Sequence, residues 1–174
     1  MKRHFMFLTA CILTLVFTSC SDDDDNGNAG GPVPTTFLTV TVDGVEKSFS
    51  NVQGRWVDGG NFLEINATND GIEWVSFTVM SETTRVPAGN YTLDDGSAFT
   101  ILALYTAGSG ASQNYAATRG TLAPEDAFAL QINQISNTNA EGTFSGVLAS
   151  VEGETTLGTV TLTNGAFSTS IGPN

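Results

Sequence analysis

The sequence has few of the residues on which most enzyme active sites depend. Its only histidine is His4, and its only cysteines are Cys11 and Cys20, so the chain beyond Cys20 contains neither residue type. That part of the chain therefore cannot form a Ser-His-Asp triad, a Cys-His pair or a His/Cys zinc site. It also lacks a Walker-type glycine loop and a GxGxxG segment between a strand and a helix. We accordingly expect no metal and no cofactor.

Positive charge is scarce as well. The chain has 6 Lys and Arg residues against 18 Asp and Glu residues, for a net charge of −12. Removal of Lys2 and Arg3 with a cleaved N-terminal segment would leave 4 basic and the same 18 acidic residues, or −14. Nucleic-acid binding and charge-driven adsorption to anionic headgroups both need clustered Lys and Arg. We therefore expect neither kind of partner.

No apolar run is long enough to cross a membrane as a helix. Phe5–Phe17 reads FMFLTACILTLVF and has 13 residues, whereas a spanning helix needs about 20. Because Lys2 and Arg3 precede it and small residues follow it, the run suits the h-region of a signal peptide. The run leads into Phe17-Thr18-Ser19-Cys20.

This tetrapeptide resembles the lipobox of bacterial lipoproteins, although Phe17 stands where that pattern usually has an aliphatic residue. The resemblance implies that residues 1–19 are a cleaved signal peptide and that Cys20 carries the lipid. Three acyl chains would make the attachment permanent, because each buried methylene contributes about 0.8 kcal/mol. The alternative is an ordinary secretory signal with a chance cysteine near its cleavage site.

The segment after Cys20 predicts a tether. Residues 21–36 read SDDDDNGNAGGPVPTT and have no periodic apolar residues, so they cannot bury enough surface to become ordered. A Gly-rich coil of this length has a reach of about 20–24 Å. We expect residues 20–36 to be a lipidated cysteine with a flexible tether, and residues 37–174 to be a single domain.

The acidic run in the tether has three interpretations. It fits the opening of an EF-hand loop, but Val33 stands where the bidentate Glu is required. It is also a solvated charge run that keeps the linker extended. Finally, it resembles the export signal of Bacteroidetes lipoproteins, which implies a lipid anchor in the outer membrane and exposure at the cell surface. We favour this resemblance, which rests on Ser21, Asp22, Asp23, Asp24 and Asp25.

The domain has the period of β-strands. From Leu38 to Val42, apolar residues alternate with threonines, and the same alternation recurs along the chain. Asp43-Gly44 and Asn164-Gly165 supply the positive φ angles of tight hairpin turns. The pattern predicts an all-β antiparallel meander that forms a β-sandwich or a flattened barrel of about ten strands. The expected strands, some of which merge, lie near 37–42, 45–49, 52–57, 62–68, 73–80, 90–93, 98–106, 113–122, 127–135, 142–150, 157–163 and 166–171.

Four short motifs follow one another in this domain. They are FLTVTVDGVEKSF at 37–49, GNYTL at 89–93, GTFS at 142–145 and VTLTNGAFS at 160–168. Together they resemble a family of small all-β Bacteroidetes lipoproteins of unknown function. The resemblance implies location and fold, and no activity.

One catalytic chemistry remains open, which is a glycosidase-like pair of carboxylates. The alternative is that these acids are solvated turn residues, which we favour because adjacent strand residues point to opposite faces. The pairs are Asp94 with Asp95, Glu125 with Asp126, and Glu64 with Glu73 across a hairpin.

Two tryptophans are predicted ligand contacts. On strand 73–80, Trp74 falls on the face opposite Val75 and Phe77, where its ring could stack on a sugar or anchor a protein. Trp56 is the second such residue. The alternative for both is that they pack in the second layer of a sandwich core or cover an open end. We therefore expect a non-enzymatic β-domain with a binding or structural role in the envelope, and a glycan or envelope protein as partner. The alternative is a carbohydrate-active enzyme that uses a carboxylate pair.

Overall fold

The computed structural model of the chain describes residues 35–93, 96–108, 113–118 and 127–172. In these ranges, no helix has the length and apolar character needed to cross a membrane. Several predicted features lie outside the described residues, namely the signal peptide, Cys20, Ser21, Asp22, Asp23, Asp24 and Asp25, and the acids Asp94, Asp95, Glu125 and Asp126.

The described chain consists of strands, turns and one short 3-10 turn, so the predicted all-β class is confirmed. Because alternate residues face the core, each strand buries one side and exposes the other. The elements are β1 (Phe37–Val42), β2 (Val45–Phe49), β3 (Asn51–Val57), η1 (Asp58–Gly60), β4 (Phe62–Thr68), β5 (Trp74–Ser81), β6 (Gly89–Thr92), β7 (Phe99–Ala107), β8 (Gln113–Thr118), β9 (Ala127–Ile135), β10 (Asn139–Glu152) and β11 (Thr155–Gly172).

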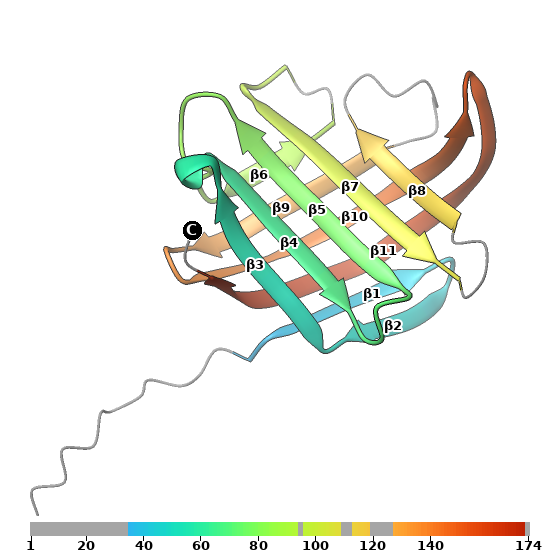
Figure 1. Cartoon of the computed structure of the whole chain (residues 1–174), viewed down its shortest axis with the longest axis horizontal. Helices are drawn as coiled ribbons and strands as arrows, with labels where there is room; N and C mark the ends of the chain where they lie inside the picture. The colour runs from blue at the N-terminus through green and yellow to red at the C-terminus, as the bar shows by residue number, and fades with distance from the viewer. Residues whose placement is uncertain (1–34, 94–95, 109–112, 119–126, 173–174) are drawn as a thin grey trace, which may run out of the picture. The chain divides into compact units, whose positions relative to one another are not determined.

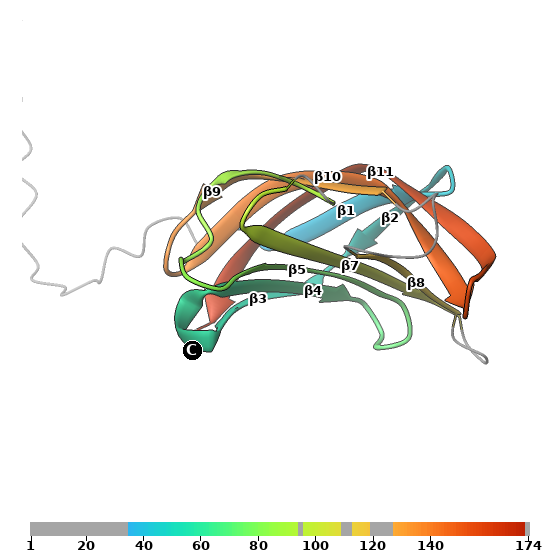
Figure 2. The same cartoon turned by 90° about the horizontal axis from the view of Figure 1, so that it is seen from above.

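Within the described residues the strands form one eleven-stranded sheet in the order β2-β1-β11-β3-β4-β5-β7-β8-β10-β9-β6. The sheet folds into two layers, with β3, β4, β5, β7 and β8 in one layer and the remaining strands facing them (Figures 1 and 2). A further pairing between β10 and β11, which are far apart in this order, closes the sheet on itself. The predicted sandwich or flattened barrel is thereby confirmed.

The two longest strands join the layers. β11 pairs with β1 and β10, and its end then pairs in parallel with β3 through Ile171 and Gly54. β10 pairs with β9 over most of its length and then with β8, where Ala149 lies opposite Ala116. The sheet is therefore mixed. Its order departs from the predicted simple meander because β11 lies between β1 and β3, β8 pairs with β10, and β6 pairs with β9 at the edge. Sequence patterns describe hairpins, whereas these contacts arise from closure of the sheet.

The dipeptide Asn164-Gly165 is not the predicted turn but lies inside β11. Asn164 has a φ of 53°, and the pairing of β11 shifts register beside it on both sides. The shift on β1 falls between Thr39 and Thr41, and the shift on β10 falls between Phe144 and Gly146. At each shift, β11 contains one residue more than its partner strand. An extra residue of this kind is a β-bulge, which bends the strand.

An aromatic cluster holds the layers together. Phe77 of β5 lies with its ring centroid 5.1 Å from that of Phe167, 5.3 Å from that of Phe144 and 6.2 Å from that of Phe128. The last three rings come from β11, β10 and β9, in the opposite layer. Offset and edge-on contacts of this kind stabilise a core beyond the area they bury.

Candidate functional site

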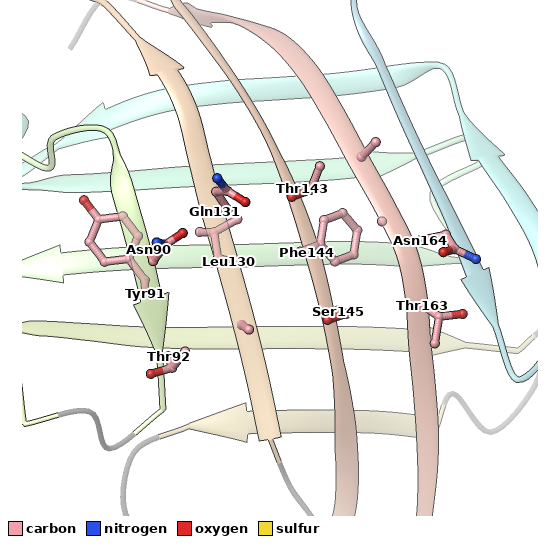
Figure 3. Close-up of a pocket in the computed structure, with 13 residues that line it drawn as sticks. Asn90, Tyr91, Thr92, Leu130, Gln131, Thr143, Phe144, Ser145, Thr163 and Asn164 are labelled. Atoms are coloured by element: carbon pink, nitrogen blue, oxygen red, sulfur yellow. The ribbon is translucent and has the colours of Figure 1, made fainter.

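A shallow groove of about 660 Å³ crosses the outer face of the layer formed by β6, β9, β10 and β11 (Figure 3). Its floor contains small residues such as Ala129, Gly165 and Ala166. No charged residue lines it in the part of the chain that the structure describes. The polar side chains at its surface are those of Asn90, Thr92, Gln131, Thr143, Ser145, Thr163 and Asn164.

The glycines of β10 and β11 allow the strands to approach closely beneath this groove. A Cβ atom on Gly165 would lie 2.5 Å from the carbonyl oxygen of Phe144. A Cβ atom on Gly142 would overlap the carbonyl oxygen of Gln131 and lie 2.8 Å from the ring of Phe167. Together with the bulge at Asn164, this close approach shapes a bent surface in place of a flat one.

The groove offers hydrogen-bonding groups that the described part of the protein does not use. Within that part, no side-chain hydrogen bond engages Asn90, Gln131, Thr143, Ser145 or Asn164. Amides and hydroxyls both donate and accept hydrogen bonds. The arrangement can therefore bind a neutral ligand that is rich in hydroxyl or amide groups.

The two aromatic residues of the groove do not form a stacking platform. The Tyr91 ring is buried against Phe99, with centroids 5.3 Å apart, and its hydroxyl donates to the carbonyl oxygen of Pro87 at 2.5 Å. Phe144 belongs to the core cluster. Binding in the groove would therefore depend on hydrogen bonds and shape.

Trp74 lies on the outer face of β5, as predicted, and is 38% exposed. Its Nε1 donates to the carbonyl oxygen of Gly71 at 2.9 Å and so closes the turn between β4 and β5. Only the ring remains available to a partner. The role of Trp74 as a ligand contact stays a prediction, and Trp74 is not a lining residue of the groove.

Trp56 is 5% exposed and packs at one end of the barrel beside η1. The guanidinium carbon of Arg85 lies 3.9 Å from the centroid of its ring, and both residues line a hollow of about 370 Å³. Within the described residues, its buried Nε1 has no hydrogen-bond partner. A buried N–H group without an acceptor costs about 1–3 kcal/mol of stability. Sequence reasoning named Trp56 but missed Arg85, whose only signal was the rarity of basic residues.

The predicted carboxylate pair of Glu64 and Glu73 is not brought together. The register places Glu64 opposite Thr78 of β5. Glu73 stands five residues earlier, just before β5 begins, so it lies about 16 Å away at roughly 3.3 Å per residue. Glycosidase pairs are about 5–10 Å apart. Glu64 instead binds Arg55 at 2.8 Å, and Glu73 binds Lys47 at 2.7 Å. The hairpin register, which sequence alone did not give, overturns this pairing.

The environment of Glu64 favours its charged form. Partial burial acts to raise its pKa, but hydrogen bonds from Arg55 and Asn66 outweigh burial and lower the pKa below its usual value. A general acid needs the opposite shift. Glu64 is therefore an ion-pair partner of Arg55.

Two buried tyrosines give the protein an expected sensitivity to alkaline pH. Burial raises the pKa of Tyr91 to about 12. Burial also raises the pKa of Tyr105, with help from the hydrogen bond that its hydroxyl donates to Glu73. Unfolded tyrosine ionises near about pH 10, so their contribution to stability is complete below that pH and is lost as the pH rises toward 12. We expect the urea midpoint of unfolding to fall over this range, and to fall less in Tyr91→Phe. A midpoint that does not change across it would contradict the two shifts.

Comparisons of the chain with protein-family models, curated proteins and solved structures found no match. The resemblance to envelope lipoproteins therefore stays a prediction from short motifs.

Proposed function

We propose that the domain is a non-enzymatic binding module of the cell envelope and that it holds a neutral glycan in the groove across β6, β9, β10 and β11. One observation carries this proposal. In a chain of net charge −12, the groove is lined by uncharged amides and hydroxyls. Five of these side chains make no side-chain hydrogen bond within the described structure, namely those of Asn90, Gln131, Thr143, Ser145 and Asn164.

The dimensions and chemistry of the groove support a saccharide. Its volume of about 660 Å³ falls in the range of roughly 300–1,000 Å³ that is usual for ligand sites. Asn90 of β6 pairs with Gln131 of β9, so two amide side chains stand next to each other on the same face. Paired amides match vicinal hydroxyl groups, because each amide offers a donor and an acceptor.

The predicted anchor supplies the location in this proposal. Lipid on Cys20 and the acidic signal of Ser21–Asp25 would hold the domain at the outer membrane, on the cell surface. Residues 21–36 would act as the spacer between membrane and domain.

The carbohydrate-active enzyme is less well supported. It needs two carboxylates in one cleft, one of them desolvated. Among the described residues, the groove contains no carboxylate, and Glu64 and Glu73 belong to separate ion pairs.

Replacing both groove amides tests the proposal. We expect the double variant Asn90→Ala/Gln131→Ala to bind a neutral polysaccharide roughly tenfold more weakly or worse, because each hydrogen bond contributes about 0.5–1.5 kcal/mol. Binding is measured by affinity electrophoresis of the full-length protein in detergent against a panel of neutral polysaccharides.

Gln53→Ala is the matched control, since Gln53 is an exposed amide on β3 in the other layer. Gln53→Ala should leave polysaccharide binding unchanged. A separate variant, Trp74→Ala, tests whether Trp74 is the ligand contact that the sequence predicts. The proposal fails if no neutral polysaccharide binds, or if the double variant binds as well as the wild type.

A further inference from the structure

Arg85 is the one basic residue in the described ranges that has no acidic partner. The other two, Lys47 and Arg55, each form an ion pair with a glutamate at 2.7–2.8 Å. Asp58 directly precedes Gly59, which lines the same hollow as Arg85, and Glu82 stands three residues before Arg85 in the chain. Neither acid pairs with Arg85 within the described structure. In so acidic a chain, an unpaired guanidinium is a local exception.

Packing holds Arg85 in place instead of an ion pair. Its guanidinium lies over the Trp56 ring at 3.9 Å, and its side chain passes the backbone of Gly60, where a Cβ atom would lie 3.8 Å from Cδ and Nε. Gly60 has a φ of 98°, which a residue with a side chain rarely adopts. The turn η1 and the indole thus orient the guanidinium before any ligand arrives.

The hollow beside this guanidinium contains further polar groups. Asn137 and Thr138, from the turn between β9 and β10, line it together with Trp56 and Arg85. The Asn137 side chain makes no hydrogen bond within the described structure, and neither does Trp56 Nε1. The indole N–H is buried, so a ligand here would meet one cation and one unused amide.

We propose that this hollow binds a small carboxylate-bearing sugar of the hexuronate kind. The planar fork of Arg85 matches a carboxylate through two parallel hydrogen bonds, and the sugar hydroxyls face Asn137 and Thr138. Trp56 supplies the apolar surface on which the Arg85 fork is stacked. The rest of the described surface carries excess negative charge and repels anions. Among the described residues, Arg85 is therefore the one unpaired cation that can hold an acidic ligand.

This site is independent of the groove proposed above. The groove is lined by β6, β9, β10 and β11, and shares no lining residue with the hollow. The double variant Asn90→Ala/Gln131→Ala should therefore leave binding in the hollow unchanged, so failure of either proposal can be recognised separately.

Tryptophan fluorescence provides the test. The chain has two tryptophans, so Trp74→Phe leaves Trp56 as the only reporter in the full-length protein in detergent. We expect D-galacturonate to change its emission saturably at millimolar concentrations, and D-galactose, which lacks the carboxylate, to leave it unchanged. Added sodium chloride should weaken the response by screening.

Variants in this background decide the role of Arg85. Arg85→Gln should weaken binding at least tenfold, as should Arg85→Lys, which keeps the charge and loses the fork. Arg55→Gln, which removes a paired arginine, should have no effect, and far-UV circular dichroism verifies that each variant is folded. The inference is overturned if galacturonate gives no saturable response, if Arg85→Gln binds normally, or if inorganic phosphate binds as tightly as galacturonate.

Discussion

Replacing Phe77 with alanine is expected to lower the free energy of unfolding by about 3–5 kcal/mol. Phe77 is 1% exposed and contacts rings from three strands of the opposite layer. Its removal leaves a cavity between the layers that the surrounding sheet can fill only in part. Because small domains are stable by about 5–15 kcal/mol, this loss is a large share of the total.

Urea unfolding followed by far-UV circular dichroism measures this loss, and Phe62→Ala is the matched control. Phe62 is a phenylalanine on β4 that is only partly buried and faces away from the core. Its replacement should cost about 1 kcal/mol or less, since less apolar area leaves water on folding. Similar losses for both variants would show that the cluster around Phe77 does not join the layers.

The inward position of Phe77 was predictable because alternation is a local property. Residues next to Phe77 decide which face of β5 it occupies, and the same reasoning placed Trp74 on the outer face. Closure of the sheet was not predictable in this way. The parallel contact of Ile171 with Gly54 joins residues far apart in the chain, and no local pattern encodes it.

The bulge in β11 shows why a turn signal can be misread. Asn-Gly favours positive φ, and both a hairpin turn and a bulge require it. At Asp43-Gly44 the chain does reverse between β1 and β2, whereas at Asn164-Gly165 it continues. The chain continues there because β11 pairs with β1 and with β10 both before and after the bulge.

The two candidate sites were harder to find from sequence than the strands. Asn90, Gln131 and Asn164 come from three strands and are, taken singly, ordinary solvent-facing residues. Only the pairing of β6 with β9 brings the first two together. Arg85 likewise becomes a candidate ligand contact only because its guanidinium stacks on Trp56, which lies on a strand well before it in the chain.

Gly142→Ala is the other substitution with a large expected effect, a loss of about 3 kcal/mol of unfolding free energy. The added Cβ would overlap the carbonyl oxygen of Gln131, which is backbone of β9, and lie 2.8–2.9 Å from two ring atoms of Phe167. Neither group can move freely, because Gln131 is held in the β9–β10 pairing and Phe167 packs in the core. β9 and β10 would have to separate.

Gly158→Ala separates this steric effect from the general effect of replacing a strand glycine. A Cβ on Gly158 would meet only Tyr115, at 3.8 Å, which is ordinary contact. We expect its urea midpoint to equal or slightly exceed that of the wild type, since alanine lowers the entropy of the unfolded chain. Equal stability of the two variants would show that β9 tolerates displacement at Gln131. A destabilised Gly142→Ala beside an unchanged Gly158→Ala would instead show that β9 and β10 need their close approach at Gly142.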